Sequence, residues 1–119
     1  MKAVTFKKFG GPEVLETTNI EIGKPGPKEV LIKNLSIGLN FIDTYHRSGL
    51  YPIPLPSGVG LEACGKIEEI GSEIKLFKIG DRVTHASMPI GAYAEKQIMP
   101  EDKLVSVPDG ISSEVASCI

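Results

Sequence analysis

The chain has 119 residues and a formal net charge of −2, with 41% hydrophobic and 24% charged residues. This balance indicates one globular domain with its own core and excludes a disordered tail. The charge gives no basis for nucleic-acid binding, because Lys7-Lys8 is the longest basic cluster. No apolar run approaches the ~18 residues of a membrane span, and the charged amino terminus is unlike a signal peptide. We therefore expect a cytoplasmic protein without nucleic-acid or membrane partners.

Short candidate strands follow one another along the chain, separated by glycine or proline turns. Alternating and β-branched residues predict strands over 2–9, 14–22, 29–37, 65–70, 82–86, 92–99 and 104–107. Almost no helical period lies between these segments. The spacing therefore favours a compact β-barrel or sandwich over a sheet built from βαβ units.

A helix is predicted to begin near the end of the chain, where Ser112 is a candidate N-cap. Glu114 suits the positive end of the helix dipole. The apolar pattern then continues to Ile119 without a glycine cap or a basic last turn. We expect the chain to be a fragment of a longer protein, because a domain rarely ends inside an apolar helix.

Residues 38–65 contain the candidate functional residues, beginning with a predicted short helix. Asn40 can cap this helix, Asp43 can reach back to the cap and pair with Arg47, and Gly49 can end it. Its expected buried face consists of Phe41, Ile42 and Tyr45. On this interpretation Asn40 is structural and Tyr45 belongs to the core. The alternative, in which both point a polar group into a cleft, has no support from composition.

Residues 58–63 match the dinucleotide-binding pattern G-x-G-x-x-A in letters, but their context does not fit it. That pattern requires a buried strand before the glycines and a helix after them. The preceding residues 51–56 contain three prolines, which exclude a central strand, and the following residues 65–70 alternate like a strand. We therefore predict a turn between strands, not a nucleotide-binding loop.

Three other polar residues have a structural and a functional interpretation. Glu62 lies among apolar neighbours and needs a partner, so we expect an ion pair with Arg82 or Lys66, or alternatively a carboxylate lining a cleft. His46 and His85 have no ligand partners at metal spacing and are interpreted as surface or packed residues. The two cysteines lie far apart without a CxxC pair, which argues against a structural zinc or a disulfide framework.

Taken together and in order, five motifs resemble the zinc-independent quinone oxidoreductases, the zeta-crystallin-like branch of the medium-chain dehydrogenase/reductase superfamily. They are Phe-Gly-Gly-Pro-Glu-Val-Leu (9–15), Gly-Leu-Asn-Phe-Ile-Asp-Thr-Tyr-His-Arg-Ser-Gly-Leu-Tyr (38–51), Pro-Ser-Gly-Val-Gly-Leu-Glu-Ala-Cys-Gly (56–65), Gly-Asp-Arg-Val (80–83) and Gly-Ala-Tyr-Ala-Glu (91–95). The resemblance covers the whole chain. It implies a mostly β fold, a GroES-like, partly open β-barrel with short helices over 1–119, truncated before a Rossmann domain that would bind NADPH.

The resemblance also implies a protein without zinc. Zinc-dependent relatives have a cysteine after the third strand and a histidine in a Gly-His-Glu motif. This chain has Asn40 and Leu61 at these places and keeps only Glu62. An amide and a hydrocarbon cannot replace a thiolate and an imidazole on zinc. The cysteine-bound structural zinc lobe is missing too, because residues 82–93 contain no cysteine.

In family members, Asn40, Tyr45 and Tyr51 match residues that line the cleft between the two domains. The resemblance therefore implies Asn40 and Tyr51 as catalytic residues, and Asn40, Tyr45 and Tyr51 as residues that bind the nicotinamide. The implied function is hydride transfer from NADPH to a quinone by a full-length, homo-oligomeric enzyme, with the fragment inactive alone. The alternatives are an enone or alkene reductase of the same superfamily and a stand-alone GroES-like binding module.

Overall fold

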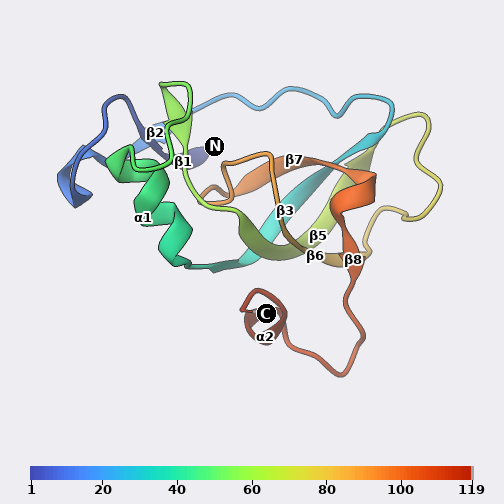
Figure 1. Ribbon diagram of the computed structural model, residues 1–119. Coiled ribbons are helices and arrows are strands. Elements are labelled where there is room, and N and C mark those ends of the chain that lie inside the picture. The colour runs from blue at the N-terminus through green and yellow to red at the C-terminus, as the bar shows by residue number, and fades with distance from the viewer. Residues whose placement is uncertain (119) are drawn as a thin grey trace.

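The computed structural model describes residues 1–118, which form two antiparallel sheets with short helices at their edges (Figure 1). The strands are β1 (Lys2–Phe6), β2 (Glu16–Asn19), β3 (Glu29–Gly38), β4 (Ser57–Gly58), β5 (Glu62–Ile70), β6 (Arg82–Ala86), β7 (Lys96–Pro100) and β8 (Val105–Ser106). The helices are α1 (Phe41–Ser48) and α2 (Ser113–Ala116), with 3₁₀ turns η1 (Pro12–Val14) and η2 (Glu101–Lys103). No helix within residues 1–118 is long and apolar enough to cross a membrane.

The mostly β fold class predicted from the sequence is confirmed. One sheet has three strands in the order β2-β1-β4, and the other has five in the order β7-β3-β5-β6-β8. A single bridge between Ala3 and Ala94 connects them outside the named strands. Within the described residues the two sheets do not close into a complete barrel.

The strands predicted over 29–37 and 82–86 are confirmed as β3 and β6. The strand predicted over 14–22 is wrong at its start, because Pro12 begins the 3₁₀ turn η1 and pairing with β1 starts only at Glu16. The strand predicted over 92–99 also starts late, at Lys96. Before Lys96 the backbone forms hydrogen bonds with the segment between β4 and β5 instead, since the Tyr93 N–H donates to the Val59 carbonyl.

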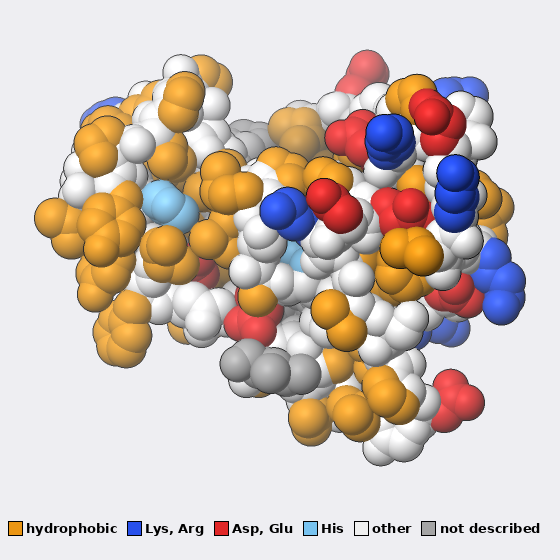
Figure 2. Space-filling model, turned by 45° about the vertical axis from the view of Figure 1, so that its right-hand side comes forward, with side chains coloured by type: hydrophobic (Ala, Val, Ile, Leu, Met, Phe, Trp, Pro, Cys, Tyr) orange, Lys and Arg blue, Asp and Glu red, His pale blue; other side chains and the backbone are white. Residues whose placement is uncertain are grey.

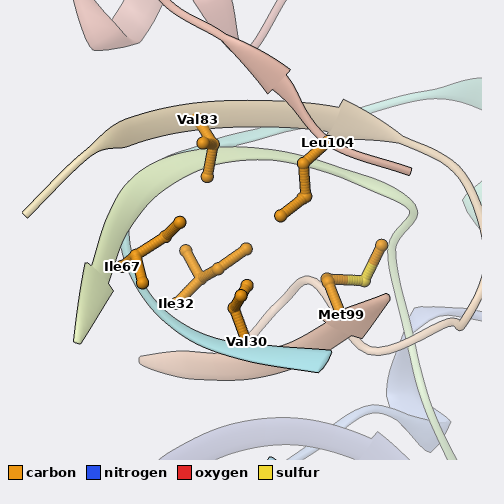
Figure 3. Packing of buried hydrophobic residues seen from close by; sticks show 6 residues of the cluster. All are labelled: Val30, Ile32, Ile67, Val83, Met99 and Leu104. Carbon is orange, nitrogen blue, oxygen red and sulfur yellow. The ribbon is translucent and has the colours of Figure 1, made fainter. Parts of the chain in front are cut away.

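The main core lies inside the curve of the five-stranded sheet. Figure 3 shows side chains from β3, β5, β6, β7 and the segment before β8 converging there: Val30, Ile32, Ile67, Val83, Met99 and Leu104. Burying one such side chain stabilises the fold by roughly 1.5–3 kcal/mol. A second cluster, consisting of Phe6, Val14 and Val59, is associated with the three-stranded sheet and the chain around it.

Helix α2 begins as predicted, because the Ser112 hydroxyl accepts from the Val115 N–H at 3.2 Å. The short helix is held on the five-stranded sheet by β6, where the Thr84 hydroxyl donates to the Ala116 carbonyl at 2.8 Å. The prediction that this helix continues toward Ile119 is wrong within the described residues, because α2 ends at Ala116 and Ser117 is its C-cap. Ile119 itself lies outside the described range.

Candidate functional site

Helix α1 begins and ends where local sequence rules place its ends. Asn40 is the N-cap, with φ −132° and ψ 154°, and it forms a capping box with Asp43. In this box the Asp43 carboxylate accepts from the Asn40 N–H at 3.0 Å, which satisfies a donor that the helix itself leaves free. Gly49 ends the helix in the left-handed region, with φ 85°. The prediction of a short capped helix is confirmed.

The buried face predicted for α1 is wrong. Phe41 is 82% exposed, and Ile42 and Tyr45 are only half-buried, whereas Asp43 and His46 are buried. The reason is that the side of α1 that carries Asp43 faces Tyr93. The Tyr93 phenol hydroxyl donates to Asp43 Oδ2 at 2.5 Å. A hydrogen bond formed fifty residues away in sequence therefore decides which side of α1 is buried.

The expected pair between Asp43 and Arg47 is not formed either. Asp43 Oδ2 accepts from the Asn40 N–H and from the Tyr93 hydroxyl. Arg47 instead donates from Nε to the Gly10 carbonyl at 3.2 Å. The Asp43 carboxylate thus binds donors at the start of α1. The Arg47 guanidinium connects the end of α1 to the loop after β1.

Glu62 is buried and has an amide partner in place of the expected cation. The Asn40 side chain donates from Nδ2 to Glu62 Oε1 at 2.8 Å. The predicted ion pair is wrong, because none of the ion pairs found in residues 1–118 involves Glu62, Arg82 or Lys66. The Arg82 guanidinium donates to the Ser113 hydroxyl at 3.2 Å instead. A neutral amide therefore provides the hydrogen bond that a buried carboxylate requires.

An open pocket of about 500 Å³ lies beside this pair. It is lined by Asn40, Phe41, Ile42, Leu61, Glu62 and Ala86. Asn40 and Leu61 therefore face the same space. Their juxtaposition follows from the sheet, because the last residue of β3, Gly38, pairs with the first residue of β5, Glu62.

Tyr45 and Tyr51 form a second group. Their ring centroids are 5.3 Å apart with planes at 67°, an edge-to-face arrangement, and the Tyr51 N–H donates to the Tyr45 carbonyl at 3.2 Å. Neither lines the pocket beside Asn40. Figure 2 shows hydrophobic side chains gathered at the left of its face, the side on which α1 lies in Figure 1. Exposed apolar residues of α1 and the segment after it include Phe41, Leu50 and Tyr51.

The glycines that match the dinucleotide pattern lie in and just after a strand, not in a nucleotide-binding loop. Gly58 belongs to β4, and Gly60, with φ 97°, leads directly into β5. No helix follows that could direct its amino terminus toward a pyrophosphate.

Two side chains near the site, the half-buried Tyr93 and the buried His85, were not identified from the sequence as important. Tyr93 supports α1 through Asp43, and burial together with that carboxylate raises the pKa of its phenol above the usual range. His85 is buried, and burial lowers the pKa of its imidazole. Neither ring nitrogen of His85 has a hydrogen-bond partner among the described residues. No local pattern signals either environment, because both depend on contacts between distant segments.

Metal-binding side chains are not grouped in the described part of the chain. Among residues 1–118, no set of three or more His, Cys, Asp and Glu side chains is arranged to hold a metal ion. Both cysteines are free thiols, Cys64 buried and Cys118 exposed.

Comparison with known proteins gives consistent matches over most or all of the chain. The family pattern of the alcohol dehydrogenase GroES-like domain matches residues 26–109. Quinone oxidoreductase of Pseudomonas aeruginosa is 54% identical over 119 residues, which are 99% of this chain and 37% of that protein. The 2-haloacrylate reductase of a Burkholderia species is 42% identical over 113 residues, 91% of this chain and 33% of that protein.

Among solved structures, Escherichia coli quinone oxidoreductase in complex with NADPH superposes with a TM-score of 0.96 at 45% identity. The match covers 98% of this chain and 36% of that one. The chain thus spans little more than a third of the length of such relatives. Because the family pattern extends over most of its residues, the chain belongs to the alcohol dehydrogenase GroES-like domain family.

Proposed function

We propose that residues 1–119 form the substrate-side domain of an NADPH-dependent quinone oxidoreductase that works without zinc. A separate domain of the full-length protein would bind most of the cofactor, and 1–119 would be inactive alone. The similarity to quinone oxidoreductases, one of them an NADPH complex, supports this function. The observation that carries the proposal is the pocket where the Asn40 amide, fixed by Glu62, faces the hydrocarbon side chain of Leu61.

The residues around this pocket fit the nicotinamide end of NADPH. A nicotinamide ring has apolar faces and a polar carboxamide, and the pocket combines the apolar Phe41 and Leu61 with one fixed amide, Asn40. Phe41 is largely exposed, so its ring is available to a ligand. When bound, NADPH supplies the hydride. The chain's own residues orient the acceptor and exclude water from the reacting atoms.

Asn40, Tyr45 and Tyr51 have different roles in this proposal. Asn40 is held rigidly at both its backbone and its side chain, so its amide can orient the nicotinamide or the acceptor. Tyr51 is half exposed at the end of α1, where its phenol can donate a hydrogen bond to the oxygen of an acceptor. Tyr45 packs against Tyr51 and would fix the position of that ring at the cofactor.

The pocket residues also support chemistry without zinc. Leu61 has no donor atom, and Asn40 Nδ2 already donates to Glu62. Glu62 is then the one carboxylate among the lining residues, whereas catalytic zinc is held by three protein ligands. We expect a strong chelator to leave the activity of the full-length enzyme unchanged.

Steady-state kinetics of the full-length protein test the function. We expect NADPH-dependent reduction of a simple quinone, and Asn40→Ala should lower kcat/KM by about 10²-fold, the usual cost of losing one positioned donor. Tyr51→Phe should lower kcat with a smaller effect on KM for NADPH. Val105→Ala, at an exposed site on β8, is the control and should have wild-type kinetics. Absence of turnover, or wild-type kinetics for Asn40→Ala, would contradict the proposal, and turnover by purified 1–119 would contradict its inactivity alone.

Reduction of an activated alkene is the second candidate, favoured by the 42% identity with 2-haloacrylate reductase. The full-length protein should be assayed with a quinone, a neutral enone and 2-chloroacrylate at equal concentrations. A kcat/KM for an alkene that exceeds the value for every quinone tested would favour this alternative.

A further inference from the structure

Asn40 is held by two hydrogen bonds, one from its side chain and one from its backbone N–H. Both of their acceptors are connected to the segment around Gly60. Its side chain donates to Glu62, the first residue of β5, two positions after Gly60. Its backbone N–H donates to Asp43, whose carboxylate also accepts from the Tyr93 hydroxyl. Two hydrogen bonds in series therefore link the Tyr93 hydroxyl to the Asn40 backbone.

The position of Tyr93 is itself fixed on three sides. Its N–H donates to the Val59 carbonyl at 2.9 Å, and its carbonyl accepts from the Val4 N–H at 2.8 Å. Its ring lies directly on Gly60, where an added β-carbon would be 2.3 Å from Cδ1. Only a residue without a side chain at position 60 leaves space for the ring. The phenol oxygen is thereby held in hydrogen-bond contact with Asp43, in the first turn of α1.

The Asp43 carboxylate depends strongly on this phenol. It is buried, and both of its donors meet at Oδ2, while Oδ1 has no hydrogen-bond partner among the described residues. An unpaired buried carboxylate is costly, so the loss of the Tyr93 hydroxyl would disfavour the buried position of Asp43. The Asn40 N–H would then lose its acceptor as well.

We propose that Tyr93 and Asp43 are positioning residues for Asn40, with Gly60 providing the space for the Tyr93 ring. They hold the Asn40 backbone so that its side chain can bond to Glu62 and keep its orientation in the pocket. This inference rests on the proposed function only where it predicts kinetics, because the hydrogen bonds to Asn40 can be measured in a protein without activity.

The first test is amide hydrogen exchange of Asn40 in the full-length protein. Tyr93→Phe keeps the ring but removes the hydroxyl, and we expect the Asn40 amide to exchange about tenfold faster, because its carboxylate acceptor is weakened. Thr18→Val is the matched control, since it removes a hydroxyl that bonds to Thr5 Oγ1 at 3.1 Å on the sheet edge. Thr18→Val should leave the Asn40 amide unchanged. Unchanged exchange in Tyr93→Phe would overturn the proposal.

The second test is kinetic and uses a double-mutant cycle. Tyr93→Phe should lower kcat about fivefold to twentyfold with little change in KM for NADPH, and should have almost no further effect in an Asn40→Ala background. Effects that multiply independently would show that Tyr93 does not act through Asn40. If Asn40→Ala itself has wild-type kinetics, the proposed function fails, while the exchange result still decides the positioning role.

A rescue series covers the case in which Tyr93→Phe does not fold. Asp43→Ala removes both acceptor oxygens, whereas Asp43→Asn keeps one oxygen that can accept from Asn40 and Tyr93. We expect Asp43→Asn to restore at least half of the Asn40 amide protection that Asp43→Ala loses. Equal exchange in the two Asp43 variants would contradict the proposal.

Discussion

Replacement of Gly60 by alanine tests how closely the Tyr93 ring is packed against the turn before β5. Gly60 has φ 97°, a value that residues with a side chain rarely adopt. An alanine β-carbon would lie 2.3 Å from Tyr93 Cδ1 and 2.6 Å from Cε1. The ring cannot easily move away, because its hydroxyl is bonded to Asp43 and its N–H to Val59.

The expected loss of stability has a backbone and a steric part. The unfavourable φ costs about 1–3 kcal/mol, and overpacking against a fixed ring costs about 1–3 kcal/mol. Gly60→Ala should therefore lower the free energy of unfolding by roughly 2–6 kcal/mol. Gly80→Ala is the matched control, because Gly80 has φ 94° but no atom within 4 Å of its added β-carbon. Its expected loss is about 1–3 kcal/mol, the backbone part alone.

Urea unfolding of purified 1–119, followed by far-ultraviolet circular dichroism, gives both losses. The difference between the two variants measures the contact with the Tyr93 ring. Adding Tyr93→Ala to Gly60→Ala removes the clash, so the double variant should be less destabilised than the sum of the single variants by about 1–3 kcal/mol. Equal losses for Gly60→Ala and Gly80→Ala, or a double variant that is strictly additive, would refute a constrained ring.

Three further predictions concern the core and two titrating side chains. Ile32→Ala, in the main core, should cost about 2–5 kcal/mol, whereas Val105→Ala, at an exposed site, should cost less than about 0.5 kcal/mol in the same assay. Burial lowers the pKa of His85 in the folded chain, so the unfolded chain binds a proton first as pH falls below about 6.5. Stability should then decrease from pH 7 to pH 5, and a slope that is unchanged in His85→Gln would contradict this assignment. Because burial and Asp43 raise the pKa of Tyr93, one of the three tyrosines should stay protonated well above pH 10 in an absorbance titration, and Tyr93→Phe should abolish this late step.

Elements defined by short-range rules were predicted well from the sequence. The central strands β3 and β6 follow from β-branched residues between glycines, and the ends of α1 follow from Asn40 and Gly49. Each of these signals acts over a few residues, so no knowledge of the tertiary fold is needed. The prediction that Gly58 and Gly60 do not start a nucleotide-binding loop was correct for the same reason, although Gly58 belongs to β4 and only Gly60 lies between strands.

The environment of α1 could not be predicted in this way. An apolar residue such as Phe41 is normally expected on the buried side of a helix, and an acidic residue such as Asp43 on the exposed side. The structure reverses this order because Tyr93, from a distant segment, donates a hydrogen bond to the buried carboxylate of Asp43. The partner of Glu62 was missed for a similar reason. The expected cations, Arg82 and Lys66, do not pair with Glu62, whereas the chain after β3 places Asn40 Nδ2 at 2.8 Å from Glu62 Oε1.

The pairing of Glu62 with an amide bears on the two acceptors that the proposed function allows, a quinone and an anionic alkene. Among the described residues 1–118, Glu62 is the only charged residue that lines the pocket beside Asn40. Its hydrogen-bond partner Asn40 is neutral, so no cation among the lining residues neutralises the negative charge of this pocket. Like charges 4 Å apart repel by roughly 1 kcal/mol in water and about 4 kcal/mol at an effective dielectric constant near 20. A quinone is neutral and avoids this repulsion, whereas a haloacrylate is an anion at neutral pH. The charge at Glu62 therefore supports a neutral acceptor, and Glu62→Gln should improve the use of an anionic one more than that of a quinone.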